Sequence, residues 1–160
     1  MKLFLKSIIT YLYSSVILKK NREDGLRVLM YHSITNEDSS DDIWSLGLNS
    51  FSEHLSYLDG NKNINLYRCT DLISQRPKDG IMITFDDGYR NNFEIAAPIL
   101  FKLKIPFSLF VITDFIKQAK RNYMNESMLQ ELADHPLVSI GSHSQSHARL
   151  TKCTRKELVN

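Results

Sequence analysis

The sequence predicts an α/β fold built on a parallel sheet, and three observations support this class. Five short segments, most of them apolar, have the length of buried strands. Helical patterns lie between most of these segments, as they do in β/α proteins. The chain has 160 residues and is 42% hydrophobic, which is enough to bury one core. The predicted strands are residues 27–31, 65–68, 81–85, 107–112 and 138–142.

The N-terminal segment, residues 1–24, stands apart from this pattern. An apolar stretch, residues 7–18, lies between two pairs of lysines. This stretch is too short to cross a bilayer as a helix, which needs about 20 residues, and no signal-peptide cleavage pattern follows it. Its apolar residues would line one helical face, which suits an interfacial membrane helix or a docking helix. We therefore expect membrane-surface association through residues 1–20, followed by one domain over residues 25–160.

The first predicted helix follows a polar, acidic stretch, residues 36–45, which indicates a loop. Ser50 and Glu53 have the spacing of a capping box at the start of a helix. Trp44, in the loop, either packs against this helix or stacks on a sugar ring. Three apolar residues then fall on one helical face that is expected to pack on the sheet: Phe51, Leu55 and Leu58.

Two more helices are expected further along the chain. Residues 90–104 form the predicted crossover after the third strand, and Pro98 should open or kink a helix there rather than lie within one. A further amphipathic helix before the fifth strand is indicated by Met128, Leu129 and Leu132.

The most informative residues follow two of the predicted strands. Asp86 and Asp87, in the segment Thr-Phe-Asp-Asp-Gly-Tyr, come directly after the third strand. His143 and His147, in His-Ser-Gln-Ser-His, come directly after the fifth. Either half alone is weak, since Asp-Gly suits turns and histidine pairs occur by chance on exposed surfaces. Both halves together, each at a strand end, favour one shared metal site.

Asp87, His143 and His147 offer one carboxylate oxygen and two imidazole nitrogens, a set that suits a divalent metal and Zn²⁺ above all. Histidines with this spacing share one face of a helical turn or a tight loop. Three protein ligands leave a position open for water, whose pKa falls to about 7 on zinc. The pattern therefore predicts a hydrolytic site, with a metal-bound water as the nucleophile and Asp86 as the general base.

These motifs resemble the first two signature motifs of the polysaccharide deacetylases, the type-4 carbohydrate esterases. The resemblance extends from about residue 29 to the C-terminus. In that family the first Asp is the base, and the second Asp and both histidines bind the metal. The resemblance thus implies Asp86 as the base and Asp87, His143 and His147 as the ligands. It also implies a distorted parallel β/α barrel, and hydrolysis of N-acetyl groups to acetate and a free amine.

His32 ends the first predicted strand. On its own, a histidine at this place is most simply explained as a strand-end residue with local hydrogen bonds. Its segment, Tyr-His-Ser-Ile at residues 31–34, is similar to the poly-N-acetylglucosamine deacetylase branch, in which the motif order is permuted and the general-acid histidine comes first. The resemblance implies that His32 protonates the leaving amine.

The chain is short for a barrel of this kind, which usually needs ~200 or more residues. Thr154 and Glu157 form a capping box that opens a helix just before the last residue, Asn160. We therefore expect an incomplete barrel, the N-terminal portion of a longer protein, without the family's third motif. The alternative is a short protein that closes its sheet edge by dimerising.

The expected substrate is an acetylated polysaccharide or oligosaccharide containing N-acetylglucosamine, and the expected location is the cell envelope. Two alternatives stay open: a C–N hydrolase of the same superfamily that acts on a small amide, and a non-catalytic saccharide-binding fragment. A net charge of +2 without a basic stripe argues against nucleic acid as a partner. Cys69 and Cys153 have no metal or redox spacing and are expected to be free thiols.

Overall fold

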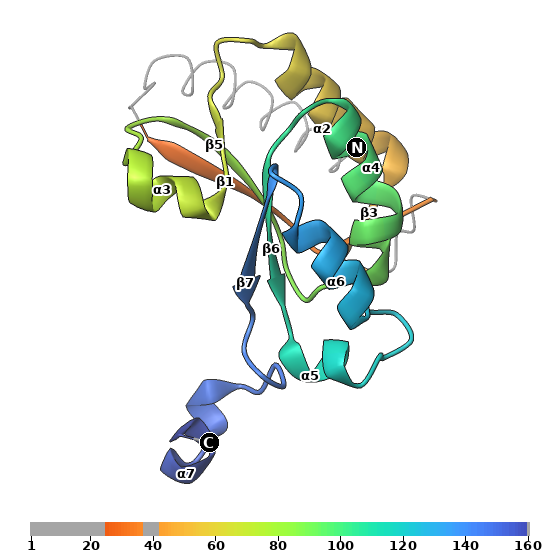
Figure 1. Ribbon diagram of the computed structural model, residues 1–160, viewed down its shortest axis with the longest axis vertical. Coiled ribbons are helices and arrows are strands. Elements are labelled where there is room, and N and C mark those ends of the chain that lie inside the picture. The colour runs from red at the N-terminus through yellow and green to blue at the C-terminus, as the bar shows by residue number, and fades with distance from the viewer. Residues whose placement is uncertain (1–24, 37–41, 160) are drawn as a thin grey trace, which may run out of the picture.

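A five-stranded parallel sheet is the centre of the computed structural model, which describes residues 25–36 and 42–159 (Figure 1). The α/β class with a parallel sheet is therefore confirmed. Each strand corresponds to a predicted one, although β4 is shorter than expected. Within the described residues, β1 and β7 are the outer strands of the order β1-β5-β6-β7. The strands are β1 (Leu26–Tyr31), β4 (Leu66–Tyr67), β5 (Gly80–Phe85), β6 (Phe107–Val111) and β7 (Val138–Ser142).

Strand β5 changes partner half-way along one of its edges. On its other edge it pairs with β1 over the full length, up to the pair Tyr31 and Phe85. On the divided edge, β4 pairs with residues 81–82 and β6 with residues 84–85. The carboxyl end of β5, which leads into Asp86, therefore lies between β1 and β6.

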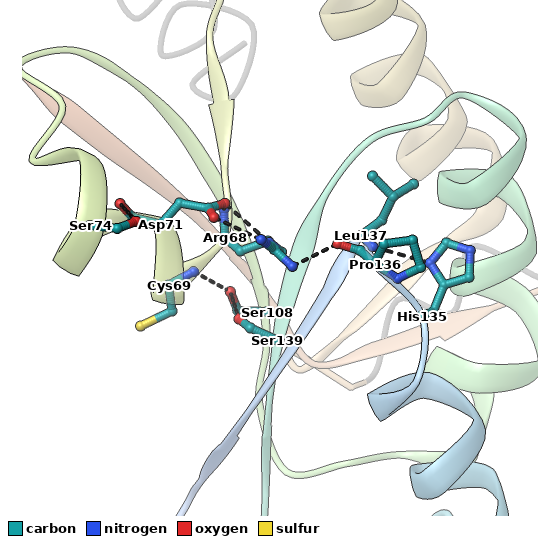
Figure 2. Close-up of polar contacts among 9 residues, drawn as sticks. All are labelled: Arg68, Cys69, Asp71, Ser74, Ser108, His135, Pro136, Leu137 and Ser139. Carbon is teal, nitrogen blue, oxygen red and sulfur yellow. Dashed lines mark hydrogen bonds and ion pairs between the residues drawn. The ribbon is translucent and has the colours of Figure 1, made fainter.

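Strand β4 pairs with β5 over two residues only. Side-chain hydrogen bonds of Arg68, the residue after β4, join this strand to the segment just before β7 (Figure 2). The Arg68 guanidinium donates to the Pro136 carbonyl at 2.6 Å and to the Asp71 carboxylate at 2.8 Å. Asp71 also accepts from the Arg68 backbone N–H at 2.8 Å, which completes a capping box at the start of α3 (Cys69–Gln75).

A second connection runs through buried hydroxyls (Figure 2). The Cys69 backbone N–H donates to Ser108 Oγ at 2.7 Å, and Ser108 shares a 2.8 Å hydrogen bond with Ser139. The first N–H groups of a helix have no partner within it, so this bond satisfies one of them. Helix α3, which the sequence did not predict, is thus fixed to β6 and β7.

Helix α2 (Leu48–Gly60) begins earlier than the sequence predicts. The predicted cap at Ser50 is wrong, because β3 (Ser45–Gly47) delivers the chain to Leu48 directly and Gly47 takes the cap position without a side-chain bond. The predicted apolar face is confirmed: the buried residues of the helix are Phe51, Leu55 and Leu58.

The predicted crossover, residues 90–104, contains a π-helix, η1 (Asn92–Ala96), that passes into α4 (Ala97–Lys102). Pro98 lies in the first turn of α4, as predicted, although the π-helix continues into that turn without a break. The amphipathic helix predicted from Met128, Leu129 and Leu132 is also present. The remaining helices are α5 (Thr113–Lys117), α6 (Glu126–Ala133), the 3₁₀ turn η2 (Leu150–Lys152) and α7 (Arg155–Val159).

The core is mostly aliphatic, with residues of the sheet and of the helices α2 and α4 among others, and four aromatic rings pack against one another within it. Tyr31 meets Phe51 edge to face at 5.3 Å, and Phe85 meets Phe107 in the same way at 5.7 Å. These rings come from β1, α2, β5 and β6. Such contacts add to the free energy gained by burial, so they help to hold β5, the strand that leads to the Asp-Asp segment.

A separate two-stranded parallel sheet pairs β2 (Ser33–Thr35) with β3. The sequence predicted a loop for residues 36–45, and β3 takes up its last residue. Residues 37–41 lie outside the described part, as do residues 1–24 with their predicted membrane-surface segment. No helix in the described part is long and apolar enough to span a membrane.

Candidate metal centre

Asp87 is placed by a sharp turn at the end of β5. Its φ of 70° and the φ of 77° at Gly88 are both left-handed. A Cβ at residue 88 would lie 3.0 Å from Val111 Cγ1, so glycine suits both the conformation and the space. Aspartate tolerates the left-handed region better than most residues. The turn directs the Asp87 side chain toward the histidine segment after β7.

His143 continues the pairing of β7 with β6, because its backbone N–H donates to the Val111 carbonyl at 2.8 Å. The chain then forms a tight loop in which the His147 N–H donates to Ser144 Oγ at 3.0 Å. The two imidazole rings lie 5.0 Å apart. The predicted proximity of the histidines is therefore confirmed, in a loop rather than a helical turn.

Helix α5 holds this loop through the main chain (Figure 1 shows α5 beside the ends of β6 and β7). The Thr113 N–H donates to the Ser144 carbonyl at 3.3 Å, and the Asp114 N–H donates to the Gln145 carbonyl at 2.9 Å. N–H groups of a first helical turn lack partners within the helix. The loop carbonyls satisfy them and are fixed in return.

Asp87, His143 and His147 converge on one point. Asp87 Oδ1 lies 3.4 Å from His143 Nε2 and 3.5 Å from His147 Nε2. The three ligand atoms all lie within 4.8 Å of one another. Asp87 Oδ1 is buried and has no hydrogen-bond partner. Burying a carboxylate oxygen without a partner costs free energy, which indicates that this oxygen serves to bind a ligand outside the chain.

The distances fit a shared divalent cation better than direct hydrogen bonds. Charge-assisted N–H···O bonds are about 2.7–2.9 Å long, clearly shorter than those found here. Ligands on a tetrahedral zinc with bonds of about 2.0–2.1 Å stand roughly 3.3 Å apart. Asp87, His143 and His147 therefore form a possible metal site, as the sequence predicts, and their donor set is one that divalent metals accept.

Asp86 lies beside this cluster, at the junction of β5 with β1. Its backbone N–H donates to the Tyr31 carbonyl at 2.9 Å. Its half-buried carboxylate has no hydrogen bond to the described residues. Asp86 thus directly precedes a residue of the possible metal site, with a carboxylate that the described residues leave without a hydrogen bond.

His32 follows Tyr31 in the chain. The hydrogen bond from the Asp86 N–H to the Tyr31 carbonyl therefore places His32 at the same end of the sheet as Asp86. Its ring packs on Trp44, with centroids 4.6 Å apart and planes inclined by 43°. The Ser33 N–H donates to the Trp44 carbonyl at 3.1 Å, which joins the two segments. Trp44 remains 53% exposed, so one part of its ring contacts His32 and another faces solvent.

Two features at this end of the sheet were missed by the sequence analysis. Tyr89 stacks on Tyr123 at 4.9 Å. Burial above all, then the Tyr123 hydrogen bond and the charge of Asp87, hold the pKa of Tyr89 well above its usual range. A neutral phenol thus lies near the cluster. Asn91 and Asn92 bond to the His32 segment. The only signal for Tyr89, Asn91 and Asn92 was their position directly after the Asp-Asp-Gly turn.

Known proteins resemble this chain in both sequence and fold. YxkH of Bacillus subtilis (strain 168), whose name describes it as a polysaccharide deacetylase, is 29% identical to this chain over 149 residues. These residues are 90% of this chain and 51% of that protein. The chain thus spans about half the length of this curated relative. The crystal structure of BC0361, a polysaccharide deacetylase from Bacillus cereus, superposes with a TM-score of 0.70 at 28% identity, over 82% of this chain and 43% of the other.

IcaB from Ammonifex degensii superposes with a TM-score of 0.64 at 26% identity, over 76% of this chain and 53% of the other. Residues 74–160 match the sequence model of polysaccharide deacetylases, and this match covers more than half of the chain and all three possible ligands. The chain therefore belongs to the polysaccharide deacetylase family.

Proposed function

We propose that this chain carries the metal-dependent hydrolysis of N-acetyl groups in a polysaccharide that contains N-acetylglucosamine. The family acts as hydrolases of C–N bonds on acetylated polysaccharide. The observation that carries the proposal is the convergence of Asp87, His143 and His147, with Asp87 Oδ1 buried and without a partner. These three residues would hold a divalent cation, which we propose is Zn²⁺.

A bound divalent metal supplies Lewis-acid chemistry: it lowers the pKa of water and polarises a carbonyl. The chain's own residues do the rest. Asp86 accepts the proton of the attacking water. His32 donates a proton to the leaving nitrogen as the C–N bond breaks, so that the products are acetate and a free amine. The free carboxylate of Asp86 and the approach of His32 to the same end of the sheet support these roles.

Finer assignments also form part of the proposal. His32 precedes the Asp-Asp segment in the chain, and this order supports the poly-N-acetylglucosamine deacetylase branch. We propose a cell-envelope location, with the domain beginning at residue 25 and residues 1–20 binding the membrane surface. The apolar stretch between lysines supports this. Flotation of the full chain with anionic vesicles tests it, and a chain that stays in the bottom fraction while the vesicles rise contradicts it.

The experiment that tests the metal site measures zinc in the purified chain after dialysis. We expect near-stoichiometric zinc in the wild type, its loss in His147→Ala, and its retention in the matched control His54→Ala. His54 is exposed and contacts Tyr31 rather than the cluster. Zinc absent from the wild type, or retained in His147→Ala, contradicts the assignment.

Acetate release then tests the reaction on short N-acetylglucosamine oligomers. Asp86→Asn should keep zinc and lose hydrolysis, because the amide accepts no proton. An active Asp86→Asn variant refutes the base. Acetate released only from small acetamides would favour the small-amide hydrolase, and sugar binding without acetate would favour the non-catalytic fragment.

A further inference from the structure

Asn92 is a fully buried polar residue close to the candidate site. It is the first residue of the π-helix η1 and is 0% exposed. Its Nδ2 donates to the His32 carbonyl at 2.7 Å. This bond connects the segment after the Asp-Asp-Gly turn to the residue that carries the proposed general acid.

Asn91 adds two hydrogen bonds to the same segment. Its Nδ2 donates to Ser33 Oγ at 2.8 Å, and its Oδ1 accepts from the Ile34 N–H at 3.3 Å. Three consecutive residues, 32–34, are thus bonded to two consecutive asparagines. The main chain that follows the His32 Cα is therefore fixed to the segment that comes after the Asp-Asp-Gly turn.

Stability alone does not explain an asparagine at position 92. Its Oδ1 is buried and has no hydrogen-bond partner. An orphan buried acceptor destabilises a fold, and an apolar side chain of similar size would avoid that cost. The π-helical turn that begins with Asn92 is itself a rare conformation, found frequently at functional sites. What the amide does provide is the bond from Nδ2 to the His32 carbonyl.

We propose that Asn92 is a positioning residue for deacetylation, which fixes the His32 main chain so that the imidazole faces the leaving nitrogen. The inference rests on the proposed function, in which His32 is the general acid. The Trp44 ring packs on the imidazole, while Asn92 and Asn91 hold the backbone beneath it. An acid must lie within hydrogen-bond reach of its target, so a displacement of this backbone is expected to impair proton donation.

The leaving group separates this role from a merely structural one. An amine must be protonated as it departs, whereas a phenolate of an aryl acetate departs without help. General-acid catalysis is therefore needed for the amide and dispensable for the ester. Asn92→Ala should lower acetate release from N-acetylglucosamine oligomers by about 10–100-fold and change aryl acetate hydrolysis by less than about twofold.

His32→Ala should show the same selectivity, and the double variant should be no worse than His32→Ala alone, because both changes remove one function. Glu94→Ala is the matched control, since Glu94 is exposed on the same π-helix. Asn92→Leu keeps the approximate size of the side chain but removes the donor, and it serves if the alanine variant does not fold. Zinc content reports on folding and on the metal site in every variant.

A readout without turnover completes the test. The chain has five histidines, so selective ¹³C labelling gives few imidazole signals, and alanine variants assign them. In zinc-loaded Asn92→Leu or Asn92→Ala, we expect the His32 signals to shift or broaden while those of His143 and His147 stay in place.

The outcomes separate the inference from the function beneath it. Equal loss of amide and ester hydrolysis with zinc retained, or unchanged His32 signals, overturns the role of Asn92. Full amide hydrolysis by His32→Ala overturns the general acid, and with it this inference. A wild type that holds zinc but cleaves neither substrate contradicts the proposed function, and the His32 signals then decide whether Asn92 positions the ring.

Discussion

Asp87→Asn is expected to stabilise the metal-free chain and to abolish its response to zinc. The Asp87 side chain is 10% exposed, and its Oδ1 has no hydrogen-bond partner. Leaving such a group buried costs about 1–3 kcal/mol, and more when it is charged. Asparagine removes the charge, keeps the size and suits the left-handed φ of 70° at this position.

The expected changes in melting temperature, without metal and with zinc, follow from these free energies. For a domain of this length, 1 kcal/mol shifts the melting temperature by about 4 °C. Because asparagine leaves a buried polar amide in place of the carboxylate, only part of this cost is relieved, and the melting temperature of the metal-free chain should rise by about 4 °C. Zinc at 100 times its dissociation constant adds about 2.7 kcal/mol to the wild type, or about 11 °C, and should add nothing to Asp87→Asn.

Thermal unfolding followed by circular dichroism, with a chelator and then with zinc, measures both shifts. Asp86→Asn is the matched control, because it removes the neighbouring negative charge but no proposed ligand, and it should keep the zinc shift. Two results would refute the reasoning: a zinc shift in Asp87→Asn as large as in the wild type, or a metal-free variant that melts below the metal-free wild type.

Three further substitutions test the elements that support the site. Gly88→Ala should cost about 2 kcal/mol of unfolding free energy, measured in urea, because φ is 77° and a Cβ would lie 3.0 Å from Val111. Asn125→Ala should cost about 1 kcal/mol in the same assay, because the side chain caps α6. Hydrogen bonds from Arg68 lower the pKa of Asp71 below its unfolded value of about 3.9. The stability from this pair is therefore present above about pH 4 and lost as the pH falls toward the folded pKa, and Asp71→Asn should flatten that loss.

Each of these predictions has a control in the chain. Gly60→Ala meets no atom within 4 Å of the new Cβ, so it should cost less than the change at Gly88, and equal costs would contradict the steric reasoning. Asn125→Asp keeps the cap, so a loss as large as with alanine would show that the cap is not the cause. Asp59 forms an exposed ion pair with Lys62, and Asp59→Asn should leave the acid limb of the unfolding curve unchanged.

The sheet was predictable where a strand is long enough to show its apolar character. The runs that became β5 and β7 end in polar motifs, so both the strands and their functional ends were visible in the sequence. β2 and β3 have three residues each, too few to show an alternating pattern, and their pairing depends on contacts between distant segments. The cap of α2 was misplaced because β3 sets the start of that helix.

The candidate site divides in the same way. Asp87, His143 and His147 were found because their chemistry and spacing are informative even without coordinates. Asn92 was not, since an asparagine at the start of a helix is usually solvated, and only the fold shows it buried against His32. Sequence patterns reveal groups that do chemistry more readily than groups that hold others in place.

The loop between the two histidines is held by its carbonyl oxygens, which accept from the backbone of α5. The side chains of Gln145 and Ser146 are exposed and take no part in that support. These two positions can therefore change identity without moving His147. Substitutions at Gln145 and Ser146 can therefore change what the rim of the site recognises, while the positions of the proposed metal ligands stay the same.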